Sequence, residues 1–298
     1  MKIAQFSDIH ITTAPLGWRP ADWFNKRLPG WLNLKCLGRK HRFRDADRVL
    51  AALEEDIQRR RPNHVIFSGD ATALGFETEL AHAVALLGRS RPGGLPGMAV
   101  PGNHDYYTAG VAASGLFERY FAAWQQGERV DGAVYPFAQR VGQVWLVAVN
   151  SCTGNRWFWD AAGSVGPEQL ARLEILLERL GPGPRILVTH YPVCLASGAP
   201  EPRYHGLRDL TALVTVAVRG RIDLWLHGHR HGAYHHCNCN LAPFPVVCAG
   251  SATQTDLWSY GEYTIEGNDF HALRRVFCPA RGSFLDSETF NLRLPPHR

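Results

Sequence analysis

In the stretch His64-Val65-Ile66-Phe67-Ser68-Gly69-Asp70, a carboxylate directly follows a short apolar run. The run His64–Phe67 predicts a buried strand. Ser68 and Gly69 then end the strand and present the side chain of Asp70 at its C-terminal tip. Ligand sites in open α/β sheets are built at this end of the strands. We therefore expect Asp70 to lie at the centre of a ligand site.

Four further strand-like runs end on residues of the same chemical types. They deliver carboxylate, imidazole and amide groups in the segments Asp8-Ile9-His10, Gly102-Asn103-His104-Asp105, Thr189-His190 and His227-Gly228-His229-Arg230-His231. Buried acids and histidines are costly without partners, so packing alone does not explain these strand ends. The pattern indicates a site for two divalent metal ions, with Asp70 as the shared bridging ligand.

The spacing within these segments fits such a site. Asp8 and His10 are two residues apart, so both point to one side of an extended strand end. His229 and His231 have the same spacing. Asn103 adds a neutral amide oxygen. A donor set of oxygen and imidazole without sulfur suits Mn, Fe, Zn, Co or Ni, and we expect Mn. Two such ions ~3.5–4 Å apart orient a phosphoryl group and generate a hydroxide nucleophile between them.

Taken in order, the motifs Asp-x-His, Gly-Asp, Gly-Asn-His-Asp, Thr-His and Gly-His-x-His resemble the calcineurin-like metallophosphoesterase superfamily. They span residues 8–231. The resemblance implies an α/β fold in which two packed mixed β-sheets are flanked by helices. The alternation of strands and helices, followed by β-hairpins, also predicts one α/β domain over residues 1–298, with a basic, aromatic cap inserted at about 11–44. Apolar periodicity predicts helices over 44–61, 77–88, 116–124, 167–180 and 207–219.

The resemblance also implies a role for each motif residue. The first metal would be held by Asp8, His10, Asp70 and His231. The second metal would be held by Asp70, Asn103, His190 and His229. His104 would protonate the leaving group or bind a phosphoryl oxygen, with Asp105 behind it.

Two departures from the family pattern favour bacterial-type phosphodiesterases. Asp105 stands where protein serine/threonine phosphatases usually have Glu, and Ala71-Thr72-Ala73 replaces the usual continuation x-x-Asp after Asp70. They leave the group that orients His104 open.

We therefore expect a dinuclear metal-dependent phosphohydrolase that cleaves a phosphodiester or pyrophosphate bond by attack of a metal-bridging hydroxide. Two narrower alternatives are a lipid pyrophosphatase of the UDP-2,3-diacylglucosamine type at the membrane surface and a cyclic nucleotide phosphodiesterase. An alternative of another class is a metal-free scaffold or binding module with the same fold. The motifs do not separate a monoester, a diester and a pyrophosphate as substrate.

Residues 16–44, called the basic segment below, carry eight Lys and Arg residues and one acid. Their charge is therefore +7, and the rest of the chain carries −2 of the total of +5. The segment also holds Trp18, Trp23 and Trp31. Three interpretations stay open: a cap packed on the domain, a cap that binds phosphate or nucleic acid, and a membrane-surface patch. We expect it to cover the mouth of the site, because it follows the first motif.

The sequence also predicts residues that contact the substrate and the location of the protein in the cell. His205 and Arg203 lie in a loop between two ligand motifs, and Arg19 lies in the basic segment, so we expect all three to contact substrate. The substrate would be a phosphate ester, amphiphilic if the aromatic residues bind it, with nucleic acid less favoured. The N-terminus leads directly into the first strand without a secretory signal, which predicts a cytoplasmic protein. The membrane-surface interpretation of the basic segment would place it at the membrane periphery.

Overall fold

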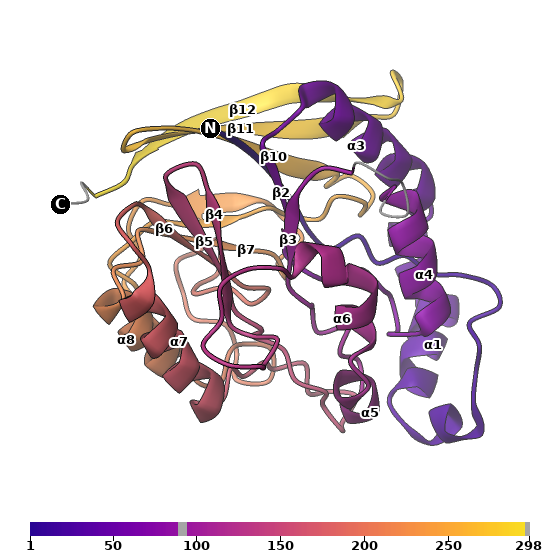
Figure 1. Ribbon diagram of the computed structural model, residues 1–298. Helices are drawn as coiled ribbons and strands as arrows, with labels where there is room; N and C mark the ends of the chain where they lie inside the picture. Colours follow the sequence, from indigo (N-terminus) through magenta and orange to yellow (C-terminus); the bar gives the residue numbers. More distant parts are fainter. Residues whose placement is uncertain (89–93, 296–298) are drawn as a thin grey trace.

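Two six-stranded sheets pack against each other, and helices cover their outer faces (Figure 1). The computed structural model describes residues 1–88 and 94–295. In the first sheet the strands lie in the order β12 (Ser283–Arg293), β11 (Asp269–Cys278), β10 (Ser259–Glu266), β1 (Lys2–Phe6), β2 (His64–Phe67) and β3 (Gly97–Ala99). In the second sheet the order is β4 (Phe137–Val141), β5 (Val144–Ala148), β6 (Arg185–Val188), β7 (Leu224–His227), β9 (Val246–Cys248) and β8 (Tyr234–His236).

Both sheets are mixed, which confirms the predicted fold class. Strands β1, β2 and β3 run parallel, and so do β5, β6, β7 and β9. The remaining neighbours pair antiparallel, including the C-terminal hairpin of β11 and β12. The parallel strands of each sheet therefore end at one edge, where the motif residues follow.

The helices fill the outer layers and one end of the molecule. Helix α3 packs on the first sheet, and α7 and α8 pack on the second (Figure 1). The helical elements are η1 (Pro20–Phe24), α1 (Arg27–Cys36), α2 (Arg39–Arg42), α3 (Ala46–Arg60), α4 (Glu77–Leu86), α5 (Ala109–Ala113), α6 (Leu116–Phe121), η2 (Ala122–Trp124), α7 (Pro167–Arg179) and α8 (Leu210–Arg219). The predicted helices are confirmed to within a few residues at their ends.

Strand alternation divides the core into layers. In β1, Ile3 joins an apolar cluster between the two sheets, together with Leu146 and Leu226 of the second sheet. Phe6 lies on the opposite face of β1 and packs in the cluster that contains Val49 of α3. Successive side chains of a strand point to opposite faces, so both faces of these strands are buried and apolar.

The first strand is shorter than the sequence predicted. The sequence indicated an extended strand end at Asp8 and His10, but β1 ends at Phe6. Asp8 and His10 have φ angles of 54° and 43°, in the left-handed region. This conformation ends the strand and turns the chain across the edge of the sheet. The short strands β4 and β8 and the long strand β12 were not predicted.

The basic segment forms η1, α1 and α2 and is fastened by a buried ion pair. The guanidinium of Arg27 lies 2.6 Å from the carboxylate of Asp22. It also donates to the carbonyl oxygen of Leu74, at 3.1 Å, and to that of Gly75. Leu34 of α1 packs in an apolar cluster with Leu74. The segment is therefore attached to the loop that follows Asp70.

Replacing Arg27 with Met is expected to lower the free energy of unfolding by about 3–5 kcal/mol. The change leaves the carboxylate of Asp22 buried without its partner, which is the costly way to break an ion pair. Urea denaturation measures the loss. Arg44→Met is the matched control, because Arg44 and its partner Asp45 are both exposed and such pairs contribute about 0–1 kcal/mol. Equal losses in the two variants would contradict the proposed anchoring role.

Candidate metal centre

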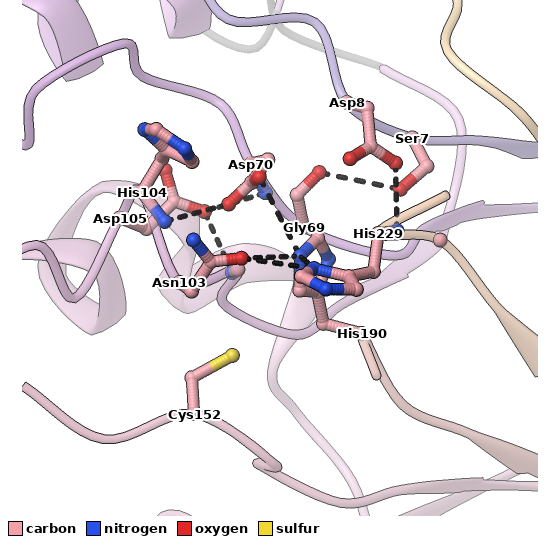
Figure 2. A network of polar contacts seen from close by, with 12 residues as sticks. Ser7, Asp8, Gly69, Asp70, Asn103, His104, Asp105, Cys152, His190 and His229 are labelled. Atoms are coloured by element: carbon pink, nitrogen blue, oxygen red, sulfur yellow. Dashed lines mark hydrogen bonds and ion pairs between the residues drawn. The ribbon is translucent and has the colours of Figure 1, made fainter. Parts of the chain in front are cut away.

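The ends of five strands bring the motif residues together (Figure 2). Asp8 follows β1, Asp70 follows β2 and His190 follows β6. Asn103 follows β3, and His229 follows β7. The two sheets meet at the carboxyl ends of their parallel strands, so residues far apart in the sequence share one site.

Asp70 lies between two groups of side chains. Its Oδ2 atom is 3.5 Å from Nε2 of His10 and 3.5 Å from Nε2 of His190. Its Oδ1 atom accepts a hydrogen bond of 2.7 Å from the backbone N–H of His104. Burial would raise the pKa of Asp70, but His190, His104 and His10 lower it well below its usual value. The carboxylate is therefore ionised and faces both groups.

The first group consists of Asp8, His10 and His231. Oδ1 of Asp8 is 3.8 Å from Nε2 of His10 and 3.5 Å from Nε2 of His231. The two imidazoles bring their Nε2 atoms within 3.1 Å of each other. Nδ1 of His10 lies 3.3 Å from the carbonyl oxygen of Thr72, and Nδ1 of His231 contacts Oε1 of Gln254. These oxygens only accept, so each Nδ1 carries the proton and each Nε2 is left as a lone-pair donor.

The second group consists of Asn103, His190 and His229. Oδ1 of Asn103 is 3.2 Å from Nε2 of His190 and 3.0 Å from Nδ1 of His229 (Figure 2). Nδ1 of His190 donates to the carbonyl oxygen of Ser68 at 2.8 Å. Nε2 of His229 lies 3.3 Å from the carboxylate of Glu201. Hydrogen bonds of this kind orient metal-binding imidazoles and raise their basicity.

Glu201 and Gln254 are absent from the motif set, and no pattern in the sequence selects them. Each lies in a loop and at no spacing that marks it, so only the fold shows that it holds an imidazole. Glu201 contacts His229, and Gln254 contacts His231.

The backbone at the site leaves no room for ordinary side chains. A Cβ at Gly102 would overlap the carboxylate of Asp70, and one at Gly228 would overlap Ser7 and crowd Asp8. Within the described ranges, seven non-glycine residues have positive φ, and four of these are site residues: Asp8, His10, Asp70 and His229. Such conformations cost of order 1–3 kcal/mol each and cluster at functional sites.

The donor atoms fit a pair of divalent cations. Oδ1 of Asp8 is buried and has no hydrogen-bond partner in the part of the chain that the structure describes. It faces Nε2 of His10 and His231, which are also lone-pair donors. Burial raises the pKa of Asp8 to about 7 against the opposing effect of His190. A cation would satisfy all three donors, whereas hydrogen bonds among them would not.

His104 points its Nε2 side toward the cavity. Its Nδ1 donates to the carbonyl oxygen of Ala73 at 2.7 Å, which answers the question of what orients the ring. Asp105 acts elsewhere: its carboxylate accepts from the backbone N–H groups of Asp70 and Gly102, both at 2.9 Å. Asp105 therefore fixes the turn that carries Asp70.

A cavity of about 370 Å³ opens over both metal groups. It is lined by Lys26, Pro29, Gly30, Asn33, Asp70, Asn103, His104, Tyr107, Phe158, Asp160, Ala161, His205, His229, Arg230 and His231. His205 was predicted to contact substrate and lies in this wall. Arg19 and Arg203 are exposed and are not among the described residues that line the cavity. Lys26 and Phe158 were not singled out by the sequence.

The two-sheet architecture and the donor set define the class of α/β proteins that bind two divalent metal ions at the carboxyl ends of parallel strands. The model of the calcineurin-like phosphoesterase family matches residues 1–233, and the chain belongs to this family. It is a metal-dependent phosphoester hydrolase, and its family implies a phosphate-ester substrate and two divalent metal ions. Among curated proteins, no significant match was found.

Solved structures share the fold at low sequence identity. A dimetal phosphatase from Danio rerio superimposes with a TM-score of 0.67 at 13% identity, over 99% of both chains. Purple acid phosphatase PPD1 from yellow lupin (Lupinus luteus) gives 0.60 at 14% identity, over 98% of this chain and 53% of that one. PhoD gives 0.60 at 10% identity, over 100% of this chain and 71% of that one.

Among the helices of the described residues, none has the length and apolar character of a membrane-spanning helix.

Proposed function

We propose that this protein cleaves a phosphodiester or pyrophosphate bond in an amphiphilic substrate at a membrane surface, with two Mn²⁺ ions. The observation that carries the proposal is the composition of the cavity wall. Asp70 and His104 share one cavity with the basic segment, through Lys26, and with Phe158 of an exposed aromatic loop. Metal chemistry, positive charge and aromatic surface therefore meet at one opening.

The ligand assignment follows the two groups of donors. Asp8, His10, Asp70 and His231 would hold one metal, and Asp70, Asn103, His190 and His229 would hold the other. When bound, the metals would polarise the phosphoryl group and lower the pKa of a water molecule.

His104 is the proposed general acid. Its Nδ1 proton is held by Ala73, so Nε2 faces the cavity and carries the second proton when the ring is cationic. That proton passes to the oxygen of the leaving alcohol or phosphate as the scissile bond breaks. The carboxylate of Asp70 accepts from the backbone N–H of His104, and the carboxylate of Asp105 accepts from the backbone N–H of Asp70, so these two residues hold the backbone around His104 in place.

An exposed aromatic group lies at the opening. It consists of Trp157, Phe158 and Trp159, and the rings of Trp157 and Trp159 stack at 5.0 Å. Phe158 is 68% exposed although it lines the cavity. Phe24, two residues before the cavity residue Lys26 in the chain, is 91% exposed. Aromatic side chains beside Lys and Arg are typical of surfaces that bind anionic lipid headgroups.

The packing of the basic segment decides which of its residues a membrane test can replace. Leu34 is 4% exposed and belongs to the apolar cluster around Leu74, and Trp31 packs against that cluster. Both support the interpretation of a packed cap, so replacing them would disturb the fold. Phe24 and Trp157 are exposed and are suitable positions for substitution.

The double variant Phe24→Ser and Trp157→Ser is expected to bind vesicles of 30% phosphatidylserine at least ~10-fold more weakly. Each aromatic side chain that becomes buried in the membrane contributes about 1.5–3 kcal/mol to the free energy of binding. Co-sedimentation with vesicles of stated composition measures the change. Val218→Ser is the matched control, since Val218 is 45% exposed on α8, away from the cavity. If the wild-type protein stays in the supernatant when the vesicles are sedimented, the membrane part of the proposal is wrong.

The catalytic part is tested by a hydrolysis screen of the purified protein with Mn²⁺. The substrates are bis-p-nitrophenyl phosphate, p-nitrophenyl phosphate, cyclic nucleotides and a UDP-diacylglucosamine. We expect turnover of the diester and the pyrophosphate ahead of the monoester. Hydrolysis of cyclic nucleotides alone would favour the nucleotide phosphodiesterase, and a protein that binds no metal and hydrolyses none of these substrates would be a scaffold.

A further inference from the structure

A lysine from the basic segment is buried in the wall of the catalytic cavity. Lys26 is the residue that precedes α1, and it is only 8% exposed. It lines the same cavity as Asp70, His104 and His229. Lysine is almost never buried unless it is paired, so its surroundings determine what it does.

The ammonium group of Lys26 contacts an aromatic ring. Within the described chain, no hydrogen bond or ion pair joins its Nζ atom to another side chain. Nζ lies 4.5 Å from the centre of the ring of Tyr107. The ring of Tyr107 is in turn 5.4 Å from the ring of His104. A Cβ at Gly30 would overlap the hydroxyl of Tyr107, so α1 is held tightly against this ring.

The charged groups that face Lys26 are already engaged. Asp160 pairs with Arg208 at 2.6 Å, and Asp70 lies between the two metal groups. Burial lowers the pKa of Lys26 to about 8, and the charges of Asp160 and Asp70 oppose this shift. The buried ammonium therefore lacks an anion of its own, and an anion in the cavity would supply it.

We propose that Lys26 binds a second anionic group of the substrate, on the leaving-group side of the bond that is cut. The proposal rests on the proposed function and narrows its substrate class to pyrophosphate-linked or otherwise doubly anionic compounds. The order of the residues along the cavity wall shows on which side of the scissile bond Lys26 lies. Asp70 marks the scissile phosphoryl group, His104 the leaving oxygen, and Tyr107 and Lys26 follow in that order along the wall.

The test compares two ligands that the enzyme cannot cleave at the natural bond. The methylene-bridged diphosphonate analogue of UDP-glucose carries two anionic groups, and benzyl(methyl)phosphinate, which has two P–C bonds and no ester bond, carries one. Calorimetry of the full chain with Mn²⁺ measures the Kd of each ligand for the wild-type protein and for Lys26→Met, Lys26→Arg and Lys35→Met. Lys35 is exposed in α1, the helix that follows Lys26, so Lys35→Met removes one positive charge without touching the cavity.

Lys26→Met is expected to weaken binding of the diphosphonate ~10–100-fold, the range for a hydrogen bond to a charged group. The Kd of benzyl(methyl)phosphinate should stay within ~2-fold, because this ligand does not reach Lys26. Lys26→Arg should restore most of the affinity. Lys35→Met should leave both Kd values within ~2-fold at 0.15 M salt, where exposed charges are screened.

Equal weakening of both ligands, or an equal effect of Lys35→Met, would overturn the proposal in favour of a general electrostatic field. A wild-type protein that hydrolyses a simple diester but does not bind the diphosphonate also overturns it and leaves the proposed function standing. Binding of the diphosphonate that depends on Lys26, without any hydrolysis, supports the anion site and refutes the proposed function. Metal content and urea denaturation check that Lys26→Met is folded and loaded.

Discussion

Asp70→Asn is expected to empty both metal positions together and to lower kcat by ~10³-fold or more. Oδ2 of Asp70 is equally distant from His10 and His190, at 3.5 Å from each, so one carboxylate serves both groups. An amide keeps the shape of the side chain but removes the charge. Stabilisation of charge by metals is worth several kcal/mol in the transition state, and each 1.36 kcal/mol corresponds to tenfold in rate.

Elemental analysis of the purified variant measures the metal content, and hydrolysis of bis-p-nitrophenyl phosphate measures the rate. Asp8→Asn is the matched control, because Oδ1 of Asp8 faces His10 and His231, and the proposed ligand set places Asp8 at the first metal alone. It should lose one metal and keep the other. A variant Asp70→Asn that loses only one metal would show that the carboxylate does not bridge.

His104→Ala is expected to keep both metals and to lower kcat ~10²–10⁴-fold, the usual contribution of general acid catalysis. The imidazole of His104 is not needed to hold a donor group, since its Nδ1 contacts the carbonyl oxygen of Ala73. The loss should be largest for esters with a poor leaving group, such as an alkyl alcohol. It should be smallest for p-nitrophenol, which leaves without a proton.

The dependence on leaving group separates the acid role from a binding role. An equal loss of kcat for alkyl and p-nitrophenyl esters would indicate that His104 binds a phosphoryl oxygen instead. A variant whose metal content falls would show that His104 is a ligand. His104 lies close enough to Asp70 and His10 for their ligand atoms to form one cluster, so elemental analysis is essential.

The two departures from the family pattern now have a structural context. Asp105 does not contact the ring of His104 but accepts hydrogen bonds from the backbone around Asp70. Thr72, which lies in the segment that replaces the usual continuation, donates to Asp105 from its backbone at 3.1 Å. The short segment after Asp70 therefore forms a closed network with Asp105, and a carbonyl oxygen orients His104.

Local patterns in the sequence predicted most of the helices outside the basic segment, most of the strands and the residues that follow them, but not β4, β8 or β12. Apolar runs such as Val144–Val149 and periodic runs such as 167–180 are local patterns, and local patterns predict local structure. Parallel strands end at a common edge, so the polar residues that follow them, such as Asp70 and His190, were expected to meet. The ordered motifs then gave the class of chemistry, because few other arrangements of Asp, His and Asn serve two cations.

Which further residues join the site depends on how distant parts of the chain pack together. Glu201, Gln254 and Lys26 approach the histidines, or the cavity beside them, from loops and from a separate segment. No periodicity marks such residues, since their partners are distant in sequence and their spacing carries no constraint. Arg27 shows the same limit: its charge was counted in the basic segment without regard to burial, but the fold buries it against Asp22. A charge is local to the sequence, whereas burial depends on everything that packs around it.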